Sequence, residues 1–241
     1  MNPDMEMVER VRSELGKEPR IGEGAHPIAL DYKDGVLVMD GELEAVAAKK
    51  LALERAAAIP GIVGIVDRLR VAPAERMGDG ELARRLGDAL AGEGAFARYR
   101  VEGAEAGKPR RVLQAPDDAA GAVTFEVSEG VVILNGEVSG LDHKRLAGVL
   151  AWWMPGTRDV VNGIAVEPPE DDTEGSLVDG VRIVLEKDPL VPAAQIRVGA
   201  SGSVVFLSGL VASAAQRDMA EKDAWCVFGV DRVVDDIRVG R

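Results

Sequence analysis

The sequence predicts an α+β protein of three tandem α-β-β-α-β units, each a three-stranded sheet backed on one face by two helices. Two observations predict this class. A pair of glycines 20 residues apart, one in an apolar strand pattern and one after a helical pattern, occurs three times: Gly41 and Gly61, Gly136 and Gly156, Gly209 and Gly229. Each second glycine is followed by two apolar residues and an acid or amide: Asp67, Asn162 and Asp235. Such self-similarity indicates repeated structural units.

The repeat divides the 241 residues into three parts. We expect the first repeat at residues 1–72, the second at 78–168 and the third at 175–241. A unit of this size buries a limited share of its surface and is marginally stable alone, so we expect the repeats to pack on one another. The join at 168–175, PPEDDTEG, has the proline and acid content of an extended spacer.

Each repeat opens with a helix and two strands. Apolar residues recur at helical spacing over 4–15, and again over 82–90 and 178–185. Two alternating strands follow, and in the first repeat Asp34-Gly35 supplies the tight turn between them.

A second helix and a third strand close each repeat. Proline and glycine do not continue a helix cheaply, so they mark where these helices end. The helices are expected at 44–59, 141–154 and 212–227, and the third strands at 65–71, 160–166 and 232–239. Aligned through their glycines, the helices share alanines four residues apart, which predicts a stripe packed closely on the sheet. These alanines are Ala52 and Ala56, Ala147 and Ala151, and Ala220 and Ala224.

The second repeat alone carries an insertion, residues 97–121. Its basic residues are a candidate contact for lipid phosphates or RNA: Arg98, Arg100, Lys108, Arg110 and Arg111. Four acids in the same segment nearly cancel this charge, and they favour a solvated hairpin or loop: Glu102, Glu105, Asp117 and Asp118.

A second candidate surface lies on the second helix of the second repeat. Val149, Leu150 and Trp153 stand where the other repeats have charged or small residues. This apolar ridge exceeds what its own three-stranded sheet should need, and burying each side chain is worth about 1.5–3 kcal/mol. We therefore expect the ridge to meet another repeat or a second copy of the chain, or else a membrane or protein partner.

The charge, the cysteine content and the apolar segments of the chain limit the kinds of partner and location that we expect. A formal net charge of −12 and a pI near 4.8 disfavour nucleic acid, because phosphate contacts need clustered positive charge. The single cysteine, Cys226, allows no intramolecular disulfide. The sequence begins without an apolar signal segment and has no run of the length of a membrane span, so we expect a cytoplasmic protein.

Motifs for chemistry are missing from the sequence. It contains no nucleophile elbow, P-loop or dinucleotide glycine motif. The two histidines, His26 and His143, do not stand at metal-ligand spacing with Cys226. We therefore expect no enzyme activity, no cofactor and no metal site.

The run 131–138, VVILNGEV, followed by Pro155-Gly156 and by Val160-Val161-Asn162, resembles the BON domain. The resemblance extends over most of the chain outside the joins and the insertion. It implies an αββαβ fold, no catalytic residues, and association with phospholipid or the membrane surface in bacterial stress responses, which makes the protein membrane-peripheral. A protein interaction or scaffolding module and a potassium sensor remain alternatives, and the oligomeric state is left open. The third repeat departs from the pattern, since Leu210 replaces Glu42 and Glu137.

Overall fold

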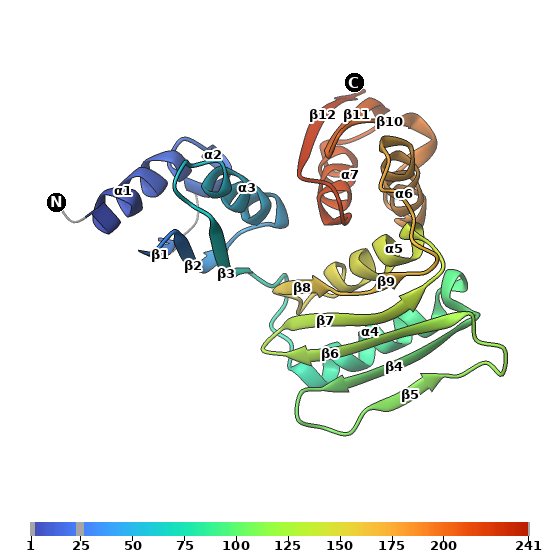
Figure 1. Ribbon diagram of the computed structural model, residues 1–241. Coiled ribbons are helices and arrows are strands. Elements are labelled where there is room, and N and C mark those ends of the chain that lie inside the picture. The colour runs from blue at the N-terminus through green and yellow to red at the C-terminus, as the bar shows by residue number, and fades with distance from the viewer. Residues whose placement is uncertain (1–2, 23–26, 241) are drawn as a thin grey trace. The chain divides into compact units, whose positions relative to one another are not determined.

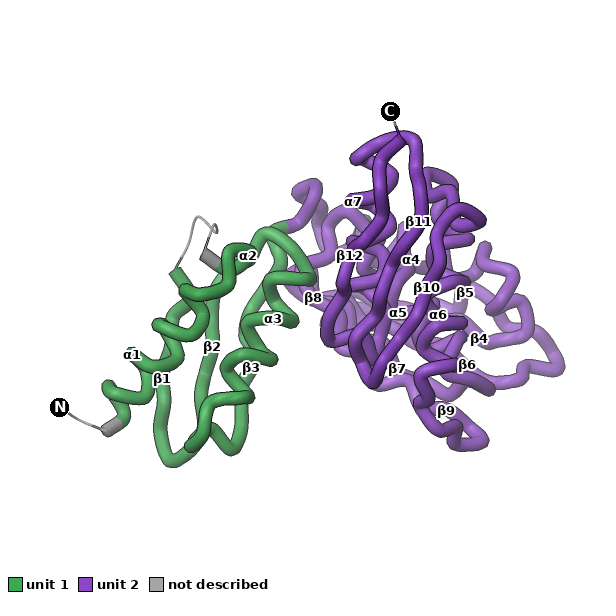
Figure 2. The backbone as a smooth tube through the Cα atoms, turned by 90° about the horizontal axis from the view of Figure 1, so that it is seen from above, with its two compact units in different colours: residues 1–72 green, residues 73–241 purple. Residues whose placement is uncertain are grey.

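The computed structural model describes residues 3–22 and 27–240. The chain forms two compact units, residues 1–72 and 73–241 (Figure 2). The first unit holds the first repeat, and the second unit holds the other two. The third repeat follows the expected α-β-β-α-β order, the first adds only the short helix α2, and the second adds strands, so the mixed helices and sheets confirm the α+β class.

The first repeat is a three-stranded sheet of order β1-β2-β3, with β1 antiparallel and β3 parallel to β2. Asp34 and Gly35 both have positive φ and form the expected two-residue turn between β1 and β2. Its elements are α1 (Pro3–Leu15), α2 (Pro19–Gly22), β1 (Ala29–Lys33), β2 (Val36–Leu43), α3 (Val46–Ala57) and β3 (Gly64–Val71).

The third repeat has the same topology, with sheet order β10-β11-β12. Its two helices lie together on one face of the sheet (Figure 1). Its elements are α6 (Glu174–Lys187), the 3-10 turn η2 (Ala193–Gln195), β10 (Ile196–Ser201), β11 (Val204–Val211), α7 (Ala214–Cys226) and β12 (Arg232–Val239). The other face of this sheet is left open.

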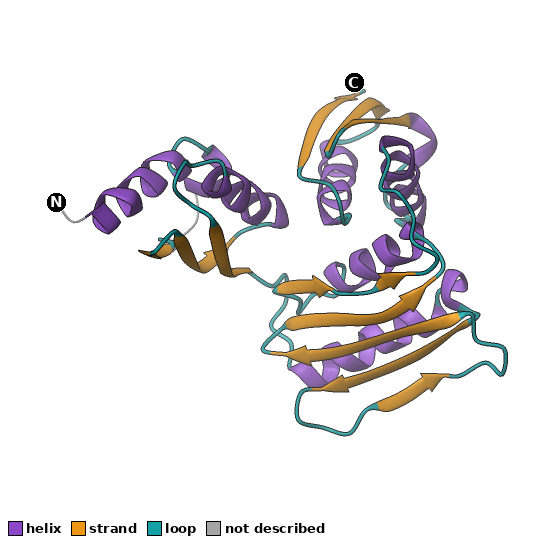
Figure 3. Cartoon of the chain, viewed as in Figure 1, coloured by secondary structure: helices purple, strands orange, loops and turns teal. Residues whose placement is uncertain are grey.

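The second repeat departs from the expected three strands, because its sheet has six. The order is β5-β4-β6-β7-β8, and β9 pairs with β7 beyond β8. Helices α4 and α5 lie on one face of this sheet (Figure 3). Its elements are α4 (Asp79–Gly92), η1 (Gly94–Phe96), β4 (Tyr99–Glu105), β5 (Arg111–Gln114), β6 (Gly121–Ser128), β7 (Val131–Val138), α5 (Leu141–Trp152), β8 (Asp159–Asn162) and β9 (Ala165–Val166).

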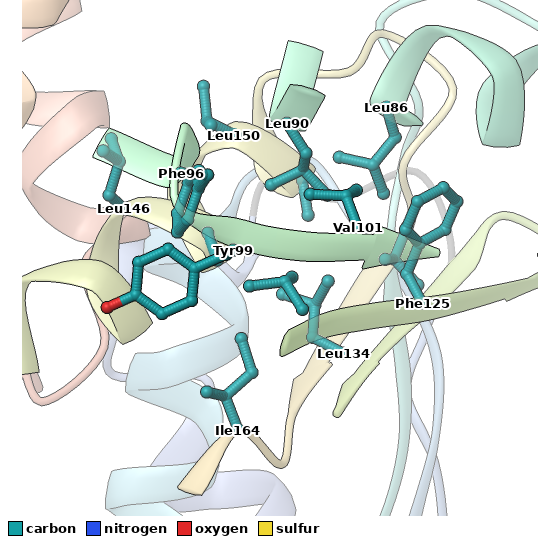
Figure 4. Packing of buried hydrophobic residues seen from close by; sticks show 14 of the residues in the cluster. Leu86, Leu90, Phe96, Tyr99, Val101, Phe125, Leu134, Leu146, Leu150 and Ile164 are labelled. Carbon is teal, nitrogen blue, oxygen red and sulfur yellow. The ribbon is translucent and has the colours of Figure 1, made fainter. Parts of the chain in front are cut away.

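Part of segment 97–121 forms a hairpin, one of the two expected forms, but the expectation that the segment is solvated was wrong for β4. β4 lies inside the sheet, parallel to β6 and antiparallel to β5. The reason is the alternation of Arg98 and Arg100 with Tyr99 and Val101, a strand period that buries the tyrosine and the valine in the core (Figure 4). The insertion therefore widens the second repeat's sheet and enlarges its core.

The paired glycines hold backbone positions that a side chain would disturb. A Cβ atom at Gly136 would lie 2.0 Å from the carbonyl oxygen of Ala122 on β6, and one at Gly209 would lie 2.1 Å from that of Gln195, just before β10. Gly61 and Gly229 end their helices with φ of +103° and +89°. A Cβ at Gly41 would lie 3.3 Å from the Cα of Ile28, a less close approach than at Gly136 or Gly209, and Gly156 packs against Met77.

The acid or amide that follows each second glycine has one structural role. Asp67 accepts a hydrogen bond from the N–H of Leu69 at 2.9 Å, and Asp235 accepts one from Ile237 at 2.9 Å. Asn162 does the same for Ile164 at 3.3 Å, where it separates β8 from β9. These side chains stabilise the third strand. The alanine stripe is fully buried in all three repeats, as its pattern predicts.

Candidate functional site

The apolar ridge of the second repeat packs against the core of its own repeat and against the third repeat. Leu150 is 8% exposed and belongs to the same core cluster as Leu86 and Leu90 (Figure 4). The widened sheet and α4 supply the apolar residues that surround Leu150. Val149 is fully buried, and Trp153 donates its Nε1–H to Oδ1 of Asp223 in the third repeat at 2.8 Å. Helix α5 thus packs against α6 and α7 of the third repeat.

Arg145 is the main polar link between the second and third repeats. The sequence around Arg145 did not predict this role. The Arg145 side chain is 1% exposed. Its guanidinium donates to the carbonyl oxygen of Ser176 at 2.9 Å, to that of Phe228 at 3.2 Å, and to the carboxylate of Asp172. Gly180 in α6 makes room for it, since a Cβ there would lie 2.6 Å from the arginine Cδ. A glycine inside a helix lowers helix stability, so Gly180 was the one feature of the sequence that could have indicated a close contact on α6.

The join at 168–175 is tied to the helices around it. Asp172 pairs with Arg145, and Glu170 accepts the N–H of Leu141 at the start of α5 at 2.9 Å. Thr173 caps α6 through a reciprocal pair of bonds with Ser176. The predicted spacer is extended, but its acids fix the second repeat to the third.

Lys144 makes a further link in the same place. The matching residue of the first repeat, Lys49, pairs with Asp67 at 3.0 Å, and that of the third repeat, Arg217, lies 3.8 Å from Asp235. In the second repeat the acid is replaced by Asn162, which donates to the Lys144 carbonyl oxygen at 2.8 Å. The lysine ammonium lies over the ring of Phe228, 4.5 Å from its centroid.

The basic residues of the insertion are divided between two places. Arg98 and Arg100 lie at the start of β4, where they pair with Asp118 and Glu102. Lys108, Arg110 and Arg111 are exposed at the hairpin between β4 and β5, and Lys108 pairs with Glu105. The length of β4 separates the two groups, so they do not form a single patch.

The described residues include one of the two histidines, and no group of three or more histidine, cysteine, aspartate or glutamate side chains among them could hold a metal ion. His26 lies outside the described residues. His143 lies beside Tyr99, with 5.1 Å between ring centroids, and its Nδ1 is 2.8 Å from Asp142. Cys226 is half-buried at the end of α7.

The open face of the third sheet combines apolar and basic side chains. Phe206 and Leu210, which point away from α6 and α7, are 41% and 57% exposed. The strand register places Phe206 between Gly199 and Val234 and places Leu210 beside Arg238. We call this surface the third-sheet face, and its side chains are Arg197, Val204, Phe206, Ser208, Leu210, Arg232, Val234, Asp236 and Arg238.

The other two repeats show how unusual this face is. Leu210 stands where the first and second repeats have Glu42 and Glu137 on their own open faces. Phe206 stands where the second repeat has Ile133. Three arginines against one aspartate make the third-sheet face locally basic in a chain whose formal net charge is −12. The third-sheet face therefore differs from the matching faces of the other two repeats at Leu210, where an apolar residue replaces an acid.

Comparison with protein families supports the repeat. The family model of the BON domain matches residues 4–73, 109–168 and 174–241. The chain belongs to the BON domain family. BON domains are non-catalytic binding modules, and the three matches agree with three tandem copies. The second match begins after β4 and leaves out α4.

Two further comparisons give one similar sequence and one solved structure. An uncharacterized protein in the gshII 5' region of Anaplasma centrale is 29% identical over 123 residues, which cover 49% of this chain and 82% of that protein. The C-terminal domain of CdsD, a structural protein of the type III secretion system of Chlamydia trachomatis, is 11% identical, with 98% of each chain covered and a TM-score of 0.26. This score is too low to support an inference.

No helix in the described part of this BON protein combines the length and the apolar content needed to cross a bilayer.

Proposed function

We propose that this BON protein associates with phospholipid surfaces through the third-sheet face. The observation that carries the proposal is the exposure of Phe206 and Leu210 on β11, with Arg197 on β10 and with Arg232 and Arg238 on β12. Apolar side chains suit the boundary between headgroups and acyl chains, and arginines suit lipid phosphates. The protein thereby acts as a non-enzymatic, membrane-peripheral binding module.

The acidic balance of the whole chain does not oppose this contact strongly. At physiological salt the Debye length is about 8 Å, so a bilayer responds mainly to the charges nearest to it. Each arginine close to an anionic surface is worth about 1 kcal/mol. Partial burial of the phenylalanine and the leucine adds about 1–2 kcal/mol each. The sum supports weak, reversible and salt-sensitive binding.

Leu210→Glu, which restores the residue of the other two repeats, is expected to weaken binding to anionic vesicles at least about tenfold, because it removes apolar contact and adds a repelled charge. Co-sedimentation with phosphatidylcholine vesicles, with and without phosphatidylglycerol, at low and physiological salt, measures this. Ile133→Glu is the matched control, since Ile133 is 37% exposed on the open face of the second repeat. Equal loss in both variants, or no binding by the native protein at low salt, would count against the proposal.

The exposed hairpin of the insertion is a second part of the proposal. Arg110 and Arg111 lie at its tip, and charge alone attracts them to lipid phosphates. Replacing both with glutamine should reduce binding to anionic vesicles about tenfold at low salt and should leave binding unchanged at high salt, where such charges are screened. Vesicle sedimentation against salt concentration separates this effect from that of Leu210→Glu. An equal loss at every salt concentration would show that the arginines do not act by charge.

A further inference from the structure

An acidic residue is buried where the second and third repeats meet. Asp223 on α7 is 2% exposed, and its Oδ1 accepts the indole N–H of Trp153. Its Oδ2 is also buried and receives no hydrogen bond from the described residues. A buried carboxylate oxygen without a donor is costly, so this oxygen requires a partner.

The first repeat has an ion pair at the matching position. Arg55 occupies the place of Asp223 on the matching helix, and it pairs with Glu18 at 2.6 Å. Glu18 stands three residues after Leu15, the last apolar residue on the buried face of α1. In the third repeat the residue three after Leu185 is Asp188. An arginine–glutamate pair in one repeat is thus replaced by two aspartates in another.

The neighbouring charges do not supply a cation to Asp223. On α5, Arg145 is engaged with Asp172, and at the end of α6, Lys187 pairs with Glu93 at 2.6 Å. On β12, Asp235 lies near Arg217. The charged group that acts on Asp223 is Asp188, whose own Oδ1 accepts the N–H of Leu190 at 2.7 Å.

We propose that Asp223 and Asp188 form a proton-operated joint between the second and third repeats, closed while Asp223 carries a proton and loosened when it loses that proton. A protonated Asp223 keeps the Trp153 bond on Oδ1 and gives Oδ2 a hydrogen to donate to Asp188. The proton thus stands in for the arginine of the first repeat. An ionised Asp223 leaves a buried carboxylate facing the half-buried carboxylate of Asp188.

The direction of the pH effect follows from the environment of Asp223. Burial raises the pKa of Asp223 from 3.8 to about 7, against the lowering effect of the Trp153 hydrogen bond and with a further rise from Asp188. When the joint opens, water restores the ordinary pKa. The closed joint is therefore most stable at low pH, and the ratio of closed to open forms should fall about tenfold per pH unit up to about pH 7 and level off above it.

Hydrogen exchange of the native protein and of Asp223→Asn tests this joint. Asparagine is uncharged, and it can accept from Trp153 and donate to Asp188 at every pH. The ratio of native to variant protection factors in α5 and α7 cancels the intrinsic pH dependence of exchange. This ratio should fall about a hundredfold between about pH 5 and 7 and stay constant between about pH 7 and 9.

The indole proton signal of Trp153 gives an independent readout in the native protein. It should titrate with a midpoint near neutrality, and Asp188→Asn should lower that midpoint, because the repelling charge is removed. The Trp225 indole, which donates to Glu221 at 3.3 Å, is the internal control and should not follow the same curve. A protection ratio that is independent of pH would overturn the proposal, and so would a Trp153 titration that leaves the ratio constant.

Discussion

Arg145→Ala is expected to uncouple the third repeat from the second and to cost about 2–5 kcal/mol, because a large buried side chain and its hydrogen bonds are removed. The change leaves the carbonyl oxygens of Ser176 and Phe228 without their donor, and it opens a cavity beside Gly180. Urea unfolding followed by tryptophan fluorescence measures the effect. One transition for residues 73–241 should split into two, with the third repeat unfolding first.

The control for this prediction is Arg217→Ala on α7. Arg217 is also bonded to acids, but its side chain is 39% exposed, so its loss should cost less than about 1 kcal/mol and should leave a single transition. A native-like single transition in Arg145→Ala would mean that apolar contacts of α5 with α6 and α7 hold the repeats together without the arginine.

Gly136→Ala is expected to unfold the second repeat or to cost at least about 3 kcal/mol. The added Cβ would lie 2.0 Å from the carbonyl oxygen of Ala122 on β6, and the φ of +122° is unfavourable for alanine. β7 is the strand that joins β6 to β8, so a shift there disturbs the whole sheet. Thermal unfolding followed by circular dichroism measures the loss.

Gly199→Ala in β10 is the matched control, because a Cβ at Gly199 meets no other atom within 4 Å. We expect that variant to stay within about 1 kcal/mol of the native protein. If both variants lost the same stability, the cost would come from strand propensity and not from the close approach of β6.

Much of the fold was predictable because the three repeats can be compared position by position. The alanine stripe, the glycine pairs and the strand-stabilising Asp67 follow from positions that recur at fixed spacing. Leu210 was visible as a departure from the glutamates of its copies, but its exposure depends on which face the helices cover. The sequence therefore indicated that the third repeat differs, and the strand register showed where.

The rest of the site was not predictable, because it depends on what makes the second repeat unlike the others. Charges along 97–121 suggested solvent, although Tyr99 and Val101 alternate as a strand does. The apolar ridge exceeds what a three-stranded sheet would bury. The sheet of the second repeat is wider than that, and Leu150 belongs to its core. Arg145 resembles any helical surface arginine in sequence, and its burial arises only when α6 presents Gly180 to it.

The bond between Trp153 and Asp223 has a consequence for how the chain assembles. Tandem copies of one fold risk docking in the wrong pairs while they mature. The first repeat has Ala58 where the second has Trp153, so it offers no indole to the third repeat's buried acid. If the third repeat docked on the first repeat, Asp223 would be buried without a hydrogen-bond donor. Docking on the second repeat, which supplies Trp153, is therefore favoured.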